Sequence, residues 1–190
     1  MSLHAIHEPI RVSCQPRAAE VPAEWRATHV ISLLDPALAD EHVPVIRSAE
    51  HIVARLRDQE NPYETSHFPE LVESLFETVR PAVETRNSRI LVHCHAGISR
   101  STAFAYAMIA HSAGPGLEEQ AFGALMSIVN KPWPNRRIIE ILDQRWKRDG
   151  ALLRPLDDMR ARYPNRIEAL HKYNLKRKFF ELVPCEIYNR

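Results

Sequence analysis

The chain has 190 residues, enough for one full domain with a modest extension but short for two independent cores. Hydrophobic residues make up 45% and charged residues 26%, which excludes global disorder, and no apolar run is long enough for a membrane-spanning helix. The 25 basic and 24 acidic residues nearly cancel, so a strongly charged surface for nucleic acid or a membrane is not expected.

The first 60 residues predict short strands joined by loops. β-Branched and aliphatic residues cluster in runs bounded by Pro and Asp, and these runs are the candidate strands 10–14, 29–33 and 51–56. Asp35-Pro36 predicts a turn or a short helix between the second and third strands. Polar, turn-forming residues over 58–67 then predict a loop.

The apolar pattern after this loop predicts a long amphipathic helix. Six apolar residues repeat at three- and four-residue spacing and share one helix face: Phe68, Leu71, Val72, Leu75, Phe76 and Val79. Ser66 is a suitable N-cap, and Pro81 would kink or end this helix. The short apolar run 89–93 predicts a buried central strand.

Helices are predicted for most of the remaining chain, over 101–111, 117–129 and 135–148. Prolines interrupt residues 151–190, where 165–180 could form a helix with a basic exposed face, either solvated or used for docking. This order predicts an α/β fold in which helices flank a central mixed sheet of four or five strands. We expect residues 1–150 to form the main domain and 151–190 to pack on it as a helical extension.

The stretch His93-Cys94-His95-Ala96-Gly97-Ile98-Ser99-Arg100-Ser101 lies between the predicted central strand and the next helix. At this place an α/β fold presents backbone amides and a helix N-terminus to anions. Cys94 as a thiolate could attack phosphorus and form a cysteinyl-phosphate intermediate. Residues 95–99 could wrap their N–H groups around phosphate oxygens, with Gly97 allowing the turn, while Arg100 could bind two oxygens with its planar fork.

Two neighbours of the proposed nucleophile have supporting roles in this interpretation. The Ser101 hydroxyl could donate to the Cys94 sulfur and make it a better leaving group, and His93 could orient the loop or simply pack in the core. The His-Cys-His run is not expected to bind metal, because adjacent strand residues point to opposite faces. No cofactor is expected. Cys14 and Cys185 are assigned no catalytic role, although a disulfide with Cys94 is left open.

The motif Cys-x5-Arg-Ser preceded by His resembles the signature of the cysteine-dependent protein tyrosine phosphatase superfamily, and is most similar to its dual-specificity branch. A weaker likeness extends over about residues 28–148, and the segment 131–135 resembles the family's turn before its last helix. The resemblance implies a metal-independent phosphatase for phosphotyrosine, with phosphoserine and phosphothreonine as further substrates. It also implies a phosphate loop between the central strand and a helix, in a catalytic domain over residues 1–150.

The resemblance further implies a general acid, which in this family is an aspartate on a loop before the nucleophile. Asp58 lies 36 residues before Cys94, directly after the third candidate strand, and is the matching residue. It would protonate the leaving oxygen and then activate water. Glu60 and Glu64 on the same loop are the alternatives.

Other functions stay open at this stage. The five loop positions contain no lysine, which weakens a phosphoinositide substrate, and an RNA 5′-phosphate is more remote. A rhodanese-like sulfur transferase would use a similar cysteine loop without an upstream acid, and a non-catalytic phosphate-binding module is a third class. We expect a phosphorylated protein or peptide as the partner, no nucleic acid and no membrane insertion. The start of the chain does not resemble a signal peptide, so a cytoplasmic location is expected.

Overall fold

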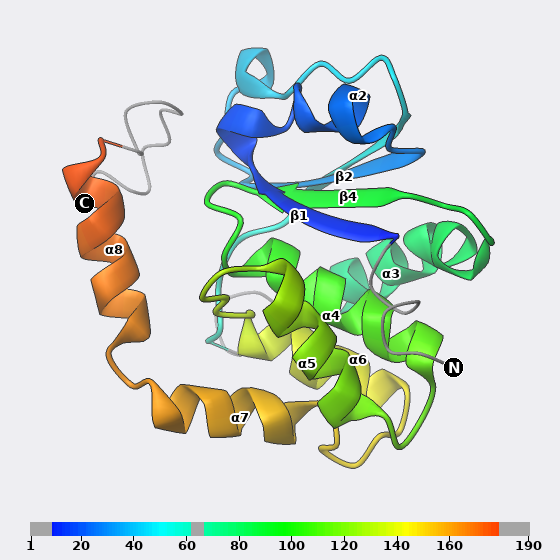
Figure 1. Ribbon diagram of the computed structural model, residues 1–190, viewed down its shortest axis with the longest axis vertical. Helices are drawn as coiled ribbons and strands as arrows, with labels where there is room; N and C mark the ends of the chain where they lie inside the picture. Colours follow the sequence, from blue (N-terminus) through cyan, green and yellow to red (C-terminus); the bar gives the residue numbers. More distant parts are fainter. Residues whose placement is uncertain (1–8, 62–66, 179–190) are drawn as a thin grey trace.

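Figure 1 shows the computed structural model, which describes residues 9–61 and 67–178. Four strands form one sheet in the order β1-β4-β2-β3, and all neighbouring pairs are parallel. Their bounds are β1 (Ile10–Cys14), β2 (His29–Leu34), β3 (Glu50–Arg55) and β4 (Ile90–Cys94). The four strands predicted from apolar runs agree with these bounds to within one or two residues.

The α/β fold is confirmed, but the described sheet is parallel throughout and not mixed. The reason lies in the length of the connections. Antiparallel neighbours can be joined by a turn of a few residues, whereas parallel neighbours need a crossover connection of about a dozen residues or more. Each connection between successive strands here spans at least 14 residues, which is enough to return the chain to the starting edge. All four strands therefore end at one edge of the sheet.

The helices are divided unequally between the two faces of the sheet (Figure 1). The short α2 (Val21–Trp25) covers one face, where Trp25, Val30 and Leu91 form a small apolar cluster. The other face carries the main core, which five helices cover: α3 (Phe68–Glu84), α4 (Arg100–Ala113), α5 (Glu118–Ile128), α6 (Arg136–Arg145) and α7 (Leu153–Arg162). Residues alternate along β4 between these two cores, as a sheet buried on both faces requires.

Helix α4 lies at the centre of the main core. Every residue from 100 to 110 is buried, and alanine occupies four of these positions, so the neighbouring helices can approach closely. The helix begins directly after the loop that follows β4 and ends at Ala113, where Gly114 with a φ of 87° follows as the C-cap. The helix predicted over 101–111 is therefore confirmed, and it fixes the position of the cysteine-containing loop against the sheet.

Two α-helices of the described residues were not predicted. Helix α2 falls in a stretch expected to be a loop, and α7 contains Pro155, one of the prolines expected to break the chain after residue 150. Pro155 lies in the first turn of α7, where a missing N–H removes no intrahelical bond. Pro81, which was expected to kink or end α3, lies near the C-terminal end of that helix, and the helix continues past it to Glu84. Ser66, the expected cap of α3, lies outside the described residues.

The C-terminal part of the described chain consists of two different helices. Leu152, Leu156 and Met159 of the α7 region are buried in the main core. Helix α8 (Arg166–Lys176) then runs along the side of the domain, and Asn174 is its one buried residue. Among the described residues, none of the helices combines the length and apolar character needed to cross a bilayer.

Candidate active site

The loop between β4 and α4 is fixed on one side by the end of β1. The Gln15 N–H donates to the His95 carbonyl oxygen at 3.0 Å. Gly97 has a φ of 72°, and a Cβ at this position would lie 2.6 Å from the Ser13 carbonyl oxygen. Glycine is therefore required at position 97 for two reasons: the backbone is left-handed there, and β1 approaches too closely for a Cβ.

The other side of the loop is fixed by the segment before α6. The Trp133 N–H donates to the Ile98 carbonyl oxygen at 3.0 Å, and the Asn135 N–H donates to that of Ser99 at 3.3 Å. The Thr102 hydroxyl also donates to both of these carbonyl oxygens. In contrast, the N–H groups of residues 96–99 donate to no acceptor in the described part of the chain. Four backbone donors of this loop are thus available to an anion.

Cys94 ends β4 and lies at the floor of a cavity of about 320 Å³. The cavity is lined by Asp58, Arg100 and the loop residues Ala96, Ile98 and Ser99, so the structure brings together the residues predicted from sequence. The Cys94 side chain is 2% exposed, and its Sγ lies 3.1 Å from Ser101 Oγ, within hydrogen-bond distance. This is the contact expected from the motif.

Arg100 begins α4 and is completely buried. One of its terminal nitrogens donates to the Leu56 carbonyl oxygen at 2.7 Å, and its Nε lies 3.8 Å from Asp58 Oδ2. A buried guanidinium needs hydrogen-bond acceptors around it. The Leu56 carbonyl oxygen accepts from Arg100 and the Asp58 carboxyl group lies beside its Nε, so both orient the arginine at the cavity.

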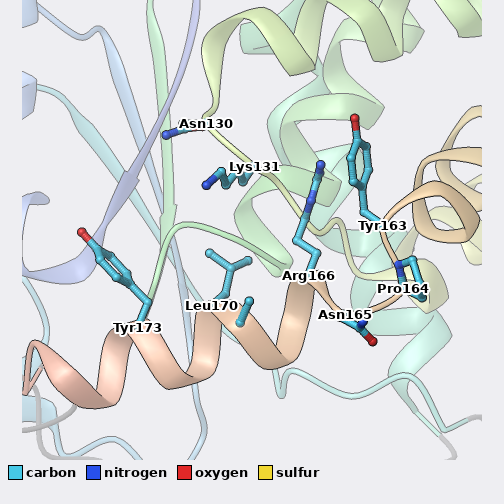
Figure 2. A pocket seen from close by; sticks show the side chains of 9 residues that line it. Asn130, Lys131, Tyr163, Pro164, Asn165, Arg166, Leu170 and Tyr173 are labelled. Carbon is cyan, nitrogen blue, oxygen red and sulfur yellow. The ribbon is translucent and has the colours of Figure 1, made fainter.

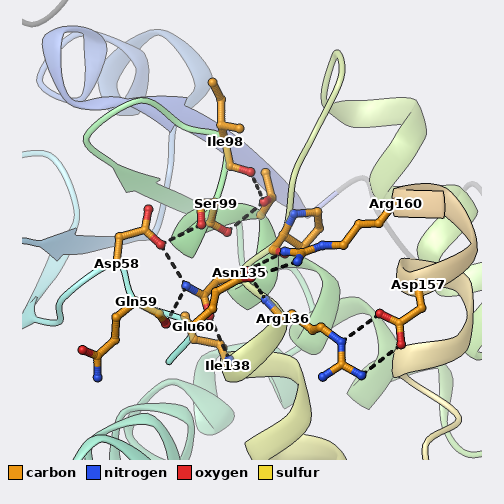
Figure 3. Close-up of polar contacts among 12 residues, drawn as sticks. Asp58, Gln59, Glu60, Ile98, Ser99, Asn135, Arg136, Ile138, Asp157 and Arg160 are labelled. Carbon is orange, nitrogen blue, oxygen red and sulfur yellow. Dashed lines mark hydrogen bonds and ion pairs between the residues drawn. The ribbon is translucent and has the colours of Figure 1, made fainter. Parts of the chain in front are cut away.

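Asp58 lies on the rim of the cavity, where two donors orient its carboxylate (Figure 3). Its Oδ1 accepts from Ser99 Oγ at 2.7 Å and from Asn135 Nδ2 at 2.8 Å. Asn135 also donates to the Gln59 carbonyl oxygen at 3.1 Å and caps α6 by accepting from the Ile138 N–H at 3.0 Å. Asn135 therefore joins the aspartate loop to the N-terminus of α6, a role that was not predicted from sequence.

Glu60 is engaged elsewhere. The Arg160 guanidinium donates to both of its carboxylate oxygens, and the Arg136 N–H donates to Oε1 at 2.8 Å. Burial raises the pKa of Glu60, but these hydrogen bonds and charges outweigh it and leave that pKa below its ordinary value. Such a carboxylate stays ionised at neutral pH. Glu64, the other alternative acid, lies outside the described residues.

His93 is buried beneath the loop and belongs to a chain of polar contacts across the sheet. Ser32 Oγ lies 2.5 Å from His93 Nε2 and 2.7 Å from His51 Nε2. Burial lowers the pKa of His93 to about 4 and also lowers that of His51. Burial and the nearby Arg100 lower the pKa of His95 to about 4 as well. These imidazoles are therefore neutral at pH 7.

Cys14 and Cys94 occupy matching positions in neighbouring strands. The two residues are register partners at the ends of β1 and β4, and both are free thiols. Burial raises the pKa of the Cys14 thiol above its ordinary value. Cys185 lies outside the described residues.

The outer wall of the cavity is formed by α8, which was not expected at the site from sequence. Five residues of this helix line the cavity opposite the loop: Ile167, Glu168, Leu170, His171 and Asn174. Their spacing of three or four residues places them on one face of the helix. The same spacing occurs on any amphipathic helix, so no local signal places this face at the cysteine loop.

Comparisons with known proteins agree with this geometry. Residues 46–123 match the protein-tyrosine phosphatase family, and this range includes Asp58 and the whole loop from Cys94 to Arg100. No curated protein is similar enough in sequence to count as a match.

Solved structures of phosphatases and of a phosphatase-like protein share the fold. The human tyrosine phosphatase-like serine/threonine/tyrosine-interacting protein is 22% identical with a TM-score of 0.59, over 75% of this chain and 93% of that one. The PTP-2 phosphatase of Cydia pomonella is 20% identical with a TM-score of 0.56, over 73% and 86% of the two chains. Human DUSP28 is 18% identical with a TM-score of 0.56, over 73% and 88%. At these identities the likeness concerns the fold alone.

Proposed function

Because this chain is a member of the cysteine-based protein tyrosine phosphatase superfamily, with the fold of its dual-specificity branch, we propose that it hydrolyses phosphotyrosine in proteins or peptides. Phosphoserine and phosphothreonine are further proposed substrates, and no metal ion takes part. One observation carries the proposal: Cys94, Arg100, Asp58 and the loop residues Ala96, Ile98 and Ser99 line one cavity, beside a loop whose N–H groups at 96–99 donate to no acceptor in the described part of the chain.

In the first proposed step, the Cys94 thiolate attacks phosphorus. A sulfur–phosphorus bond forms while the bond from phosphorus to the tyrosyl oxygen breaks, and protonated Asp58 donates its proton to the leaving oxygen. The loop N–H groups and the Arg100 guanidinium stabilise the equatorial phosphoryl oxygens. Because Arg100 is buried and oriented by Leu56, little reorganisation is needed as this charge develops.

In the second proposed step, water hydrolyses the cysteinyl-phosphate. Asp58, now a carboxylate, takes a proton from the water as its oxygen bonds to phosphorus and the sulfur–phosphorus bond breaks. Ser101 donates a hydrogen bond to the departing sulfur, which the 3.1 Å distance to Cys94 supports. The products are inorganic phosphate and the free thiolate, so no cofactor is consumed.

A second candidate is a module that binds phosphopeptides without turnover. The burial of Cys94 favours it, because limited access to the sulfur hinders the chemical step more than it hinders binding of phosphate oxygens by the loop. One structural relative is itself named as phosphatase-like and as an interacting protein. The two candidates share the binding step and differ in the chemical step.

The experiment compares phosphate release by purified protein from a phosphotyrosine peptide, a phosphoserine peptide, inositol phosphates and RNA with a 5′-phosphate, all with a metal chelator present. The proposal predicts release from the phosphotyrosine peptide, and loss of release in Cys94→Ser with retained peptide binding. Release from inositol phosphates or RNA alone would replace the proposed substrate. Binding without release by the unaltered protein would favour the second candidate, and sulfur transfer from thiosulfate would indicate a rhodanese-like enzyme.

A further inference from the structure

A second and larger cavity, of about 780 Å³, adjoins the phosphate-loop cavity along α8. Leu170 lines both cavities, so the two cavities adjoin at this side chain of α8. The second cavity is a groove between α8, the preceding turn with Tyr163 and the segment that contains Lys131 (Figure 2). A ligand bound at the phosphate loop could therefore continue into this groove.

Two basic side chains line the groove without an acidic partner in the described part of the chain. The Lys131 ammonium forms no hydrogen bond or ion pair with any residue in the described ranges. Lys131 also adopts a φ of 55°, a left-handed conformation that is uncommon for a residue with a long side chain. Arg166 contacts no carboxylate among those residues, and the neighbouring Glu168 is exposed and pairs with Lys172 at 2.6 Å.

The Arg166 side chain is nevertheless oriented. Its guanidinium lies over the Tyr163 ring, 4.0 Å from the centroid, and donates to the Pro132 carbonyl oxygen at 3.3 Å. These contacts are to neutral groups, so they leave the positive charge uncompensated, and the fork has further N–H groups that can donate. Tyr173, on the next turns of α8, adds a second aromatic wall (Figure 2).

We propose that this groove, defined by Lys131, Tyr163, Arg166, Leu170 and Tyr173, binds an acidic side chain of the substrate peptide close to its phosphotyrosine. The proposal rests on the proposed function, because it places the phosphotyrosine at the phosphate loop. Charge complementarity selects the ligand, since two cations in one groove attract a carboxylate. The aromatic walls suit the backbone of an extended peptide, because Tyr side chains offer large contact area together with hydrogen-bonding groups.

The experiment measures kcat/KM for phosphotyrosine peptides with Asp at one position from three residues before to three residues after the phosphotyrosine, against the same peptides with Asn. The unaltered chain should prefer the Asp peptide at one or two positions, by about three- to fivefold, the size expected for a partly exposed ion pair. The preference should decrease as salt is added. Para-nitrophenyl phosphate, which has no flanking residues, reports the basal activity.

Lys131→Asn removes the charge and suits the left-handed backbone, because Asn tolerates that conformation. The ratio of kcat/KM for the Asp peptide to kcat/KM for the Asn peptide should fall toward one in this variant. Turnover of para-nitrophenyl phosphate should stay unchanged. Arg166→Gln should do the same, and Arg166→Lys should restore part of the preference, which separates loss of charge from loosening of α8. Lys176→Gln is the matched control, because Lys176 is exposed on the same helix and lines neither cavity.

The outcomes separate this inference from the proposed function. No turnover of any phosphate ester by the unaltered chain would overturn the proposed function. Turnover with an Asp preference that survives both Lys131→Asn and Arg166→Gln would overturn the groove proposal alone. Turnover with no Asp preference at any position, or a preference abolished equally by Lys176→Gln, would overturn it as well.

Discussion

Asn135 and Asp58 are 77 residues apart in sequence and are joined by a hydrogen bond of 2.8 Å from Asn135 Nδ2 to Asp58 Oδ1. Because Asn135 also caps α6, the orientation of the proposed acid is coupled to a rigid element of the core. A proton donor must be correctly oriented toward its acceptor, so this contact should matter for chemistry as well as for stability.

Asn135→Ser tests that coupling. Serine can still cap α6, but its short side chain cannot reach Asp58. We expect kcat to fall about tenfold for phosphotyrosine peptide, a fraction of the 10²- to 10⁴-fold attributed to general acid catalysis. The decrease should be much smaller for para-nitrophenyl phosphate, whose leaving group needs little protonation. Steady-state kinetics with both substrates would measure this, and an equal decrease for the two would contradict a role in orienting Asp58.

Gly97→Ala should destabilise the protein and impair catalysis. The new Cβ would lie 2.6 Å from the Ser13 carbonyl oxygen at a φ of 72°, so either the loop or the end of β1 must move. We expect a loss of about 1–3 kcal/mol in the free energy of unfolding, measured by urea titration. Gly114→Ala is the control, since Gly114 also has a positive φ but has open space where a Cβ would lie. An equal loss in both variants would show that the contact with β1 is unimportant.

The buried histidine beneath the loop should make stability depend on pH. Burial lowers the pKa of His93 in the folded protein to about 4, so between pH 6.5 and pH 4 the unfolded chain binds a proton that the folded chain does not. His93 therefore contributes on the order of 3 kcal/mol to the free energy of unfolding. This contribution is present above pH 6.5 and is lost as the pH falls toward 4.

Urea titrations at pH 4.5 and pH 6.5 measure this difference. His93→Asn should have a smaller decrease in unfolding free energy between the two pH values, even though the variant is less stable at both. His42→Asn, which alters an exposed histidine, should retain the full decrease. If the pH dependence is the same in His93→Asn as in the unaltered chain, the neutral buried imidazole is not its source.

The wall formed by α8 predicts an effect on substrate binding. Ile167 lines the phosphate-loop cavity, and Ile167→Ala removes apolar surface that a phenyl ring would contact there. We expect KM for para-nitrophenyl phosphate to rise about three- to tenfold, equivalent to about 1 kcal/mol of lost apolar contact, with kcat little changed. Leu175→Ala is the matched control for Ile167→Ala. Leu175 is 51% exposed, close to the 46% of Ile167, but it lines neither cavity. Similar KM values for both variants would place α8 outside the substrate's reach.

The parts of the fold that sequence predicted best are those with local signals. The strands are short apolar runs bounded by turn-forming residues, and α3 has a clear periodic face. Asp58 could be matched by its spacing from Cys94 and its place after β3, and the structure brings both residues to one cavity. Their catalytic roles stay predictions.

The parts that sequence missed depend on contacts between distant segments. Nothing near Asn135 indicates that its side chain reaches Asp58, and nothing in α8 indicates that its Asn174 face lies over the phosphate loop. Pro155 was expected to interrupt the chain, because a proline in the interior of a helix breaks it. A proline in the first turn does not, and the sequence alone does not show where α7 begins.

The central claim is that Cys94 carries the phosphoryl group between the two steps. Its most direct measurement is mass spectrometry of Asp58→Asn quenched with acid during turnover of para-nitrophenyl phosphate, because this leaving group needs little protonation and the substitution then slows mainly the second step. The proposed mechanism predicts the added mass of one phosphoryl group on the peptide that contains Cys94, absent from Cys94→Ser. Phosphate release without any such adduct, or release that persists in Cys94→Ser, would contradict it.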